Sequence, residues 1–139
     1  MTDPTPSRPT ILIAEDEEQL REALVEMLLD NDYDVVAEAS TGSEAASLTA
    51  ALDPDLVLMD YRMPGMDGVS ATEIIKELNA RTGVVMFTAY DETSLSLEAI
   101  RAGVSGFLVK GCEPALILRA LENALEGRRS RHDAPYRAT

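Results

Sequence analysis

Cysteine and histidine are almost absent from the chain, which has one of each, Cys112 and His132. A single cysteine excludes an internal disulfide and a zinc site built from cysteine thiolates. Cys112 lies where a helix is expected to begin and His132 lies in the C-terminal tail, so we assign no chemical role to either residue. The chemistry of the chain is therefore sought among its carboxylates, hydroxyls and amines.

Positive charge is also scarce. The chain has 12 Lys and Arg residues against 25 Asp and Glu residues, which gives a formal net charge of −13. A surface this acidic repels the phosphate backbone of nucleic acids, so we do not expect direct binding to DNA or RNA. It suits a partner protein whose surface is basic or mixed.

Long apolar runs are missing. No run approaches the roughly 18 residues that a membrane helix needs, and Met1 to Pro9 lack the apolar segment of a secretory signal. A cytoplasmic location is therefore expected. The length of 139 residues suits one domain, and we expect a disordered leader over 1–9, a folded domain over 10–127 and a basic tail or linker over 128–139.

The most informative stretch runs from Leu56 to Asp60, where four apolar residues lead directly into a carboxylate. Asp53-Pro54 precedes the run and Pro64-Gly65 follows it, which indicates a short strand buried on both faces. Burying a carboxylate in such an interior is costly, so Asp60 should lie at the end of the strand and face a polar site.

Apolar runs of strand type alternate with helical periodicity five times along the chain. Strands are expected over 10–14, 33–39, 56–60, 84–88 and 106–109, and helices in the intervals 20–30, 41–52, 71–78, 91–102 and 114–127. Thr41 to Glu44 fits a capping box, and Pro114 suits a first helical turn. Gly83 and Gly127 are read as following helix ends.

This alternation predicts an α/β fold with one parallel sheet. Crossovers between parallel strands are right-handed, so helices cover both faces. We predict a flavodoxin-like (βα)5 three-layer sandwich whose five-stranded sheet has the order 2-1-3-4-5.

Four of the five expected strands end in a residue that can do chemistry: Glu15-Asp16, Asp60, Thr88 and Lys110. In the order 2-1-3-4-5, the first and third strands are neighbours, so Asp16 faces Asp60 with Glu15 near. A divalent cation relieves the repulsion among such acids, and hard oxygen ligands favour Mg²⁺. Asp60 is then a candidate nucleophile towards phosphorus. Lys110 and Thr88 are placed to bind the phosphoryl charge.

The chain resembles the receiver domain of bacterial two-component response regulators over roughly residues 10–127. The residues that carry the resemblance are Ile11-Leu12-Ile13-Ala14-Glu15-Asp16-Glu17, the run from Asp60 to Gly68, Phe87-Thr88-Ala89, and Gly106-Phe107-Leu108-Val109-Lys110. The Met63-Pro64-Gly65-Met66-Asp67-Gly68 run after a strand-end aspartate is the most specific of these motifs.

The resemblance implies that Asp60 accepts a phosphoryl group from a histidine kinase or phosphotransfer protein and that Mg²⁺ is required. Asp16, Asp60 and the backbone carbonyl of Arg62 would hold the metal, and Glu15 would help through water. Thr88 and Phe107 would form a switch pair that reshapes the surface of the fourth helix, fifth strand and fifth helix. Homodimers could form on phosphorylation. Beyond self-phosphorylation and slow self-dephosphorylation, no enzyme activity is implied.

Three features depart from the commonest receiver pattern. Glu15 replaces the more usual first aspartate, so it is expected to act through water rather than as a direct ligand. Gly111 follows Lys110 where many receivers have proline, a form that resembles receivers with helix-turn-helix output domains. Arg62 and Tyr90 occupy positions that influence how long the phosphoryl group survives, and we hypothesise that their bulk shields it from water.

Several other interpretations apply to the same residues. Glu17 and Glu18 read as the acidic first turn of a helix, and Asp30, Asp32 and Asp34 as a plain turn rather than a calcium loop. A haloacid dehalogenase phosphatase would need an acid where Arg62 stands, and a flavin carrier would need a phosphate loop where four acids follow the first strand. A stand-alone signalling module, the receiver half of a DNA-binding regulator and a phosphorylation-inert scaffold remain open.

Overall fold

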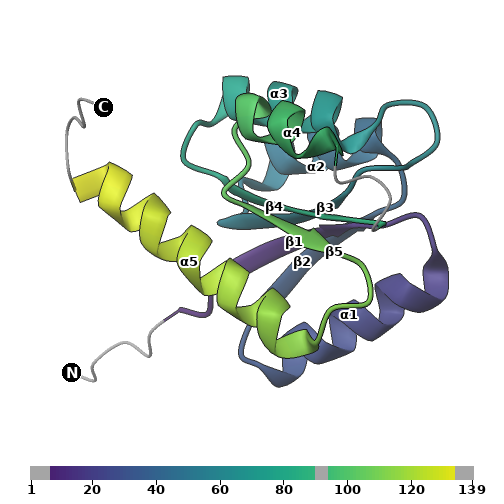
Figure 1. The fold of residues 1–139 in the computed structure, drawn as a ribbon. Helices are drawn as coiled ribbons and strands as arrows, with labels where there is room; N and C mark the ends of the chain where they lie inside the picture. Colours follow the sequence, from purple (N-terminus) through teal and green to yellow (C-terminus); the bar gives the residue numbers. More distant parts are fainter. Residues whose placement is uncertain (1–6, 90–93, 134–139) are drawn as a thin grey trace.

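A computed structural model describes residues 7–89 and 94–133 of the chain (Figure 1). Its strands and helices alternate from the first to the last. In chain order they are β1 (Thr10–Ala14), α1 (Glu18–Asp30), β2 (Asp34–Ala39), α2 (Gly42–Leu52), β3 (Leu56–Asp60), α3 (Gly68–Leu78), β4 (Gly83–Thr88), α4 (Ser96–Ala102), β5 (Gly106–Val109) and α5 (Pro114–Asp133).

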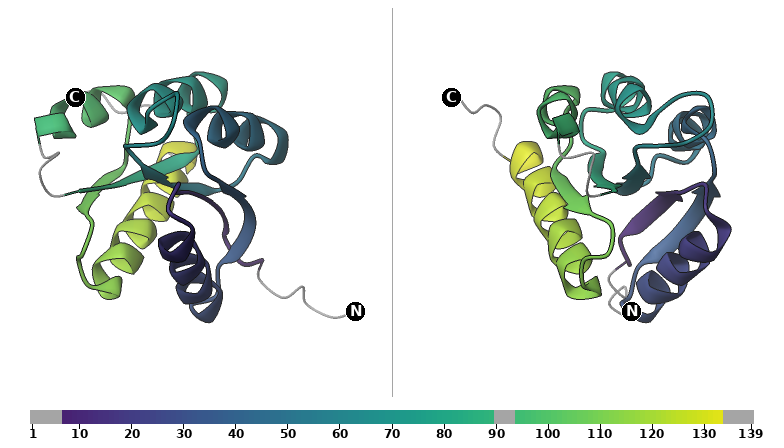
Figure 2. Two further views of the ribbon diagram at one scale, coloured as in Figure 1. Left: turned by 90° about the vertical axis from the view of Figure 1, so that its right-hand side faces the viewer. Right: turned by 45° about the vertical axis from the view of Figure 1, so that its right-hand side comes forward.

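The five strands form one parallel sheet in the order β2-β1-β3-β4-β5, as predicted. Helices α1 and α5 cover one face, and α2, α3 and α4 cover the other (Figure 2). Two apolar clusters fill the spaces between the layers, one built on Leu24, Leu28, Ile117 and Leu121 and the other on Ala45, Ala71, Ile75 and Ala99. The predicted flavodoxin-like three-layer sandwich is confirmed.

The central strand β3 is buried along its whole length, which confirms the interpretation of its apolar run. Val57 and Met59 point into the cluster under α2, α3 and α4. Leu56 and Leu58 point into the cluster under α1 and α5. Because successive side chains of a strand alternate between faces, β3 contributes to both halves of the core, and Asp60 comes at its carboxyl end.

The start of α2 follows the predicted capping box with one difference. The Thr41 hydroxyl accepts a hydrogen bond from the Glu44 amide at 3.1 Å. The Glu44 carboxylate reaches back to the amide of Ser40 at 2.8 Å, one residue before the cap. Both bonds satisfy amides that the helix itself leaves unpaired.

The interpretation of Gly127 as the end of the last helix was wrong. Helix α5 does not stop at Gly127 but runs on to Asp133, so residues 128–133 are helical rather than part of a tail. An ion pair of 3.2 Å between Arg128 and Asp55 fastens the helix beyond the glycine. Gly83 follows the end of α3, as expected, and is the first residue of β4. A Cβ there would come within 2.9 Å of Leu56 Cδ2.

The expected helix over 91–102 is described only from its middle onward. Helix α4 covers Ser96–Ala102 and ends at Gly103, whose φ of 107° is left-handed. Residues 90–93 lie outside the described part of the chain, as do 1–6 of the expected leader and 134–139 of the expected tail. Among the described residues, no helix combines the length and apolar character needed to span a membrane.

Candidate functional site

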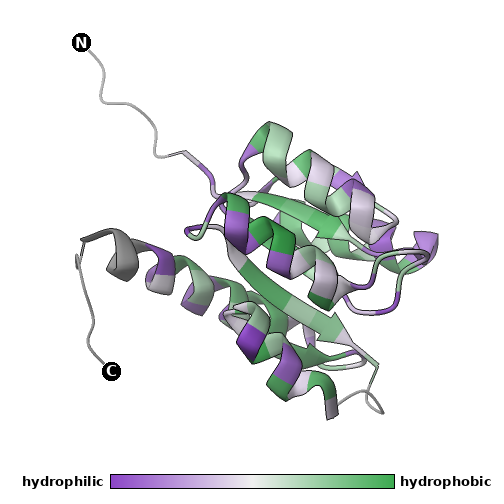
Figure 3. Ribbon diagram, turned by 90° about the horizontal axis from the view of Figure 1, so that it is seen from above, coloured by the Kyte–Doolittle hydropathy of each residue, from purple (hydrophilic) through white to green (hydrophobic). Residues whose placement is uncertain are grey.

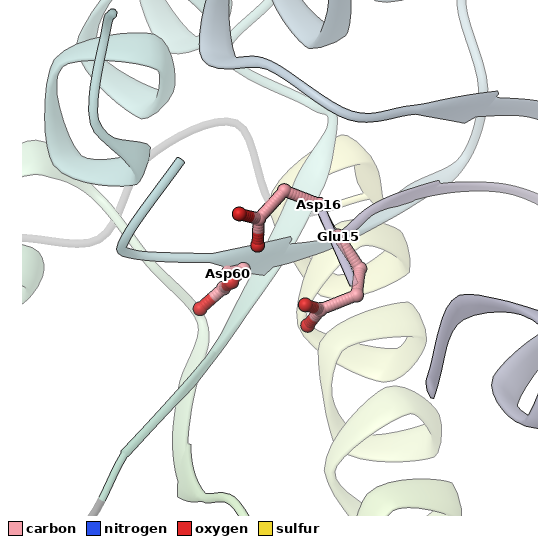
Figure 4. Close-up of side chains that lie close together, drawn as sticks. All are labelled: Glu15, Asp16 and Asp60. Atoms are coloured by element: carbon pink, nitrogen blue, oxygen red, sulfur yellow. The ribbon is translucent and has the colours of Figure 1, made fainter. Parts of the chain in front are cut away.

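Three carboxylates gather where β1 and β3 end (Figure 4). The strands are paired with Ala14 opposite Met59, so Glu15 and Asp16 follow β1 beside Asp60. One oxygen from each of the three residues lies within 4.8 Å of the others. Glu15 and Asp60 are only 1% and 3% exposed, whereas Asp16 is exposed to solvent. The cluster is therefore mostly buried and open on one side.

Lys110 supplies the positive charge of this cluster from the end of β5. Its amine lies 3.1 Å from Asp60 Oδ2 and 3.1 Å from Glu15 Oε1. The Lys110 amide donates a 2.6 Å hydrogen bond to the Thr88 carbonyl, which ties the lysine to the end of β4. Burial alone would lower the pKa of Lys110, but Asp60 and Glu15 outweigh burial and raise it. The amine is therefore charged at neutral pH.

One cation does not balance three acids. Burial and the negative charge of Glu15 raise the pKa of Asp60 from 3.8 to about 6, with Asp16 adding to the effect and Lys110 opposing it. Carboxylate oxygens are the donors that Mg²⁺ prefers, and a divalent cation would offset their repulsion. The donor set therefore fits Mg²⁺.

Arg21, which lies in the first turns of α1, also contacts this site. Its Nη1 donates a 2.8 Å hydrogen bond to the Glu15 carbonyl, and its Nε donates to Glu38 at 3.1 Å. The Glu15 side chain also accepts a 3.1 Å bond from the Glu17 amide. The only signal in the sequence is an arginine one turn into a helix that follows four consecutive acids.

The loop from β3 to α3 explains the glycine at the end of the Asp60–Gly68 run. The Gly68 amide donates to the Tyr61 carbonyl at 2.8 Å, and Asp67 caps α3 by accepting from the Ser70 amide at 2.8 Å. A Cβ on Gly68 would lie 2.1 Å from the backbone oxygen of Asp60. The loop therefore folds back directly against the residue that carries the central carboxylate.

Thr88 and Phe107 lie on the same face of the sheet. Phe107 pairs with Met86, two residues before Thr88, and packs beside the cluster under α2, α3 and α4. The Thr88 hydroxyl is buried and has no hydrogen-bond partner among the described residues. An unpaired buried hydroxyl is costly. The Thr88 hydroxyl is therefore available to donate a hydrogen bond to a group bound at the carboxyl ends of the strands.

The remaining predicted residues are placed less fully. Arg62 is exposed in the loop after Asp60. Tyr90 lies outside the described residues. Cys112 is half-buried and takes no part in the acidic cluster.

The fold and the acidic cluster at the ends of its central strands define a receiver-type signalling domain, a module rather than a classical enzyme. A sequence model of the response regulator receiver domain matches residues 11–122. The chain belongs to this family, whose members typically bind Mg²⁺ at an acidic pocket and interact with histidine kinases or phosphotransfer proteins.

Relatives of two kinds are similar to the chain. It is 36% identical over 115 residues to the chemotaxis protein CheY of Bacillus subtilis, covering 83% of this chain and 96% of CheY. It is 34% identical over 129 residues to the probable transcriptional regulatory protein NarL of Mycobacterium tuberculosis, covering 92% of this chain. The chain spans 60% of the length of that NarL protein.

Solved structures agree with this assignment. The receiver domain of the putative response regulator NarL from Mycobacterium tuberculosis has a TM-score of 0.82 at 33% identity, covering 88% of this chain and 99% of that one. A LuxR-family response regulator from Aurantimonas has the same score and identity and covers 88% of each chain.

Proposed function

We propose that the chain is a phosphoacceptor in a two-component phosphorelay and that Asp60 takes the phosphoryl group. The observation that carries this proposal is the position of Asp60, a buried carboxylate at the carboxyl end of the central strand, 3.1 Å from the Lys110 amine. Topological switch points at strand ends are the usual ligand sites of such sheets.

In this proposal Asp16, Asp60 and the backbone carbonyl of Arg62 hold Mg²⁺, and Glu15 contributes through water. The burial of Glu15, which is 1% exposed, and the exposure of Asp16 support this division, because Asp16 lies on the side of the cluster that is open to solvent. The metal, when bound, offsets the charge of the carboxylates and of the incoming phosphoryl group.

The chemical step is a transfer between two nucleophiles. An Asp60 carboxylate oxygen forms a bond to the phosphorus of a phosphohistidine while the phosphorus–nitrogen bond breaks. The departing imidazole keeps the electron pair and takes up a proton from solvent. The Lys110 ammonium pairs with the phosphoryl oxygens, and the unpaired Thr88 hydroxyl donates a hydrogen bond to them.

The phosphoryl group then acts on the surface formed by α4, β5 and α5. Thr88 moves towards the group, and Phe107 turns inward to fill the space that Thr88 leaves. Leu97, Ile100 and Leu116 are exposed on these helices, so the surface has apolar residues with which to bind a partner protein or a second phosphorylated copy. The apolar residues of 91–102 (Leu95, Leu97, Ala99 and Ile100) fit no clean helical period, which is typical of a segment that shifts at low cost.

We assign control of the lifetime of the phosphoryl group to Arg62 and Tyr90, which stand two residues after Asp60 and two residues after Thr88 in the sequence. We propose that they limit the access of water. Hydrolysis of phospho-Asp60 should then accelerate in Arg62→Ala and in Tyr90→Ala, and an unchanged rate in both variants would contradict the assignment.

Two outputs are supported by particular observations. Similarity to CheY over nearly its whole length supports a stand-alone cytoplasmic module formed by residues 10–127. Similarity to NarL proteins over 60% or 55% of their length, together with Gly111 after Lys110, supports the receiver half of a helix-turn-helix regulator. A histidine kinase or phosphotransfer protein is the donor in either case.

The direct test is intact-protein mass spectrometry after incubation with Mg²⁺ and a small phosphodonor such as acetyl phosphate. One phosphoryl group should be added to the chain, and it should be absent in Asp60→Ala. Asp34→Ala, which removes an exposed acid at the start of β2, is the matched control and should be phosphorylated normally. No added mass in the wild type would instead support an inert scaffold.

A further inference from the structure

The turn between β2 and α2 contacts both of the loops that carry the acidic cluster. On one side, the Ala39 carbonyl at the end of β2 accepts a 2.9 Å hydrogen bond from the Glu15 amide. On the other side, Gly42, the first residue of α2, approaches the backbone of Met66 in the loop that follows Asp60. The backbones of the two acid-bearing segments are therefore in contact with one short turn.

Gly42 is buried, and the space around it does not admit a side chain. A Cβ on Gly42 would lie 2.3 Å from the backbone oxygen of Met66, 2.9 Å from its carbonyl carbon and 3.0 Å from its Cβ. Non-bonded heavy atoms pack at about 3.5–4.0 Å, so even a methyl group would require a separation of about 1 Å. The nearest atoms belong to the main chain, which cannot rotate aside as the end of a flexible side chain can.

The loop, rather than the helix, is the partner that should give way to such a methyl group. Helix α2 buries Ala45, Ala46 and Thr49, and Figure 3 looks onto α2, α3 and α4 with the hydrophobic strands of the sheet beneath them. Moving α2 outward would return its apolar face to water. The described loop, residues 61–67, forms no helix or strand, so it can be displaced without breaking the hydrogen bonds of either.

We propose that Gly42 is a positioning residue that fits the acidic site to Mg²⁺. The inference rests on the proposed ligand set, because the loop that Gly42 contacts is the one that would provide the backbone carbonyl of Arg62. The other acid-bearing segment, which contains Asp16, is bound to the same turn through the hydrogen bond from the Glu15 amide to the Ala39 carbonyl. The turn therefore fixes the spacing between the two groups of ligands.

The sizes of the two common divalent cations make this spacing a determinant of selectivity. Mg²⁺ requires nearly octahedral oxygen ligands at about 2.0–2.1 Å, whereas Ca²⁺ accepts about 2.3–2.6 Å and a more flexible geometry. A loop displaced by about 1 Å should therefore lose affinity for Mg²⁺ more than for Ca²⁺. A residue that only stabilised the fold would change both affinities alike.

Isothermal titration calorimetry of the full chain with Mg²⁺ and with Ca²⁺ tests the proposal. Gly42→Ala should weaken the binding of Mg²⁺ by about fivefold or more and that of Ca²⁺ by less than about twofold. Equal weakening of the two ions, or unchanged binding of Mg²⁺, would overturn the proposal. Circular dichroism and urea unfolding check that the variant is folded.

Two other glycines give matched controls for the same substitution. In Gly106→Ala on β5, the nearest atom would lie 3.6 Å from the added methyl group, so the binding of both ions should stay as in the wild type. In Gly83→Ala, at the amino end of β4, the methyl group would lie 2.9 Å from Leu56 Cδ2. That variant should be less stable but keep the wild-type ratio of Mg²⁺ to Ca²⁺ affinity. A changed ratio would mean that destabilisation alone alters the site, which contradicts the proposal.

Glu44 allows the turn to be altered with Gly42 in place. Its carboxylate accepts a 2.8 Å hydrogen bond from the Ser40 amide within the turn. Glu44→Ala removes this bond and should weaken the binding of Mg²⁺ by about two- to threefold, whereas Glu44→Gln keeps an acceptor oxygen and should bind as the wild type does. Equal affinities in the two variants would contradict the proposal, and this comparison decides it if Gly42→Ala does not fold.

Phosphorylation by acetyl phosphate distinguishes this proposal from the phosphorelay itself. A wild type that binds Mg²⁺ but gains no phosphoryl group would refute the relay and leave the role of Gly42 intact. A wild type that is phosphorylated, with Mg²⁺ affinity unchanged in Gly42→Ala, would refute only the role of Gly42. A wild type that binds no Mg²⁺ would overturn both.

Discussion

The guanidinium of Arg21 holds the backbone of Glu15, with Nη1 donating a 2.8 Å hydrogen bond to the Glu15 carbonyl. The Glu15 amide donates in turn to the Ala39 carbonyl at 2.9 Å. Both backbone groups of Glu15 are therefore fixed, one by the first helix and the other by the edge strand β2. The direction in which Asp16 leaves β1 depends on these two bonds.

Arg21→Ala should consequently weaken the binding of Mg²⁺, by about three- to tenfold, because the turn that carries two of the acids loses a hydrogen bond worth about 0.5–1.5 kcal/mol. Isothermal titration calorimetry measures the affinity. Glu38→Gln removes the ion pair with Arg21 but keeps the bond to the Glu15 carbonyl, and it should bind Mg²⁺ nearly as the wild type does. Equal losses in the two variants would show that the ion pair between Arg21 and Glu38, rather than the bond to the Glu15 carbonyl, maintains the site.

Asp60→Asn should stabilise the protein at neutral pH when Mg²⁺ is removed by chelation. The pKa of Asp60 in the fold, about 6, lies above its ordinary value of 3.8, so the folded state disfavours the ionised carboxyl. The stability of the wild type should therefore fall as pH rises from about 4 to about 6 and stay reduced above that range. The variant should gain about 2 kcal/mol at pH 7.5.

Thermal or urea unfolding of both proteins at pH 4 and pH 7.5 measures this difference. The two proteins should be about equally stable at pH 4, where Asp60 is largely protonated. Added Mg²⁺ should raise the stability of the wild type more than that of the variant. A variant less stable than the wild type at pH 7.5 would contradict the repulsion inferred among these carboxylates.

Lys110→Gln should destabilise the protein at pH 7 by about 2 kcal/mol, because Asp60 and Glu15 then lie buried without the cation that pairs with both. The pKa of Asp60 should rise further, since Lys110 opposes its increase. At pH 4 the loss should shrink, because Asp60, whose pKa is about 6, is then largely neutral. Urea unfolding across this pH range, with phosphorylation followed by mass spectrometry, distinguishes the roles of Lys110 in stability and in chemistry.

Thr88→Val should leave the fold as stable as before or raise its stability by up to about 1 kcal/mol, because the replaced hydroxyl is buried without a partner. Phosphorylation of Asp60 should nevertheless slow, since the hydroxyl that would bind the phosphoryl group is lost. Thr72→Val is the matched control. Its buried hydroxyl donates to the Gly68 carbonyl at 2.7 Å, so the same substitution should cost about 1 kcal/mol. A Thr88→Val loss as large would show that its hydroxyl has a structural partner.

The convergence of Asp16, Asp60 and Lys110 could be predicted from sequence because the rule behind it is topological. Parallel strands deliver their carboxyl ends to one edge, and the residues that follow an apolar run mark those ends. The same reasoning could not show which acid pairs with Lys110. That depends on side-chain reach within the pocket, where the longer Glu15 meets the amine as closely as Asp60 does.

The structure differs from the sequence-based interpretation where a contact between residues far apart in the chain outweighs a local sequence rule. Glycine within a helix costs about 1 kcal/mol relative to alanine, which made Gly127 read as a stop. The helix continues past Gly127, and Arg128, the next residue, forms an ion pair with Asp55 at the start of β3. This contact with a distant part of the chain favours the longer helix. Arg21 was missed for a similar reason, since the carbonyl that it binds belongs to a turn whose path the sequence pattern does not reveal.

Asp55 has a consequence beyond holding α5. Its carboxylate accepts from the Thr10 amide at 2.9 Å and pairs with Arg128, and its amide donates to the Thr10 hydroxyl at 2.9 Å. These contacts join the amino ends of β1 and β3 to the C-terminal half of α5. They lie at the edge of the sheet opposite the carboxylates. The carboxylate cluster and the Asp55 contacts thus lie at opposite ends of the sheet, so a ligand that neutralises the carboxylates can shift the loops around them without breaking the contacts that join β1, β3 and α5.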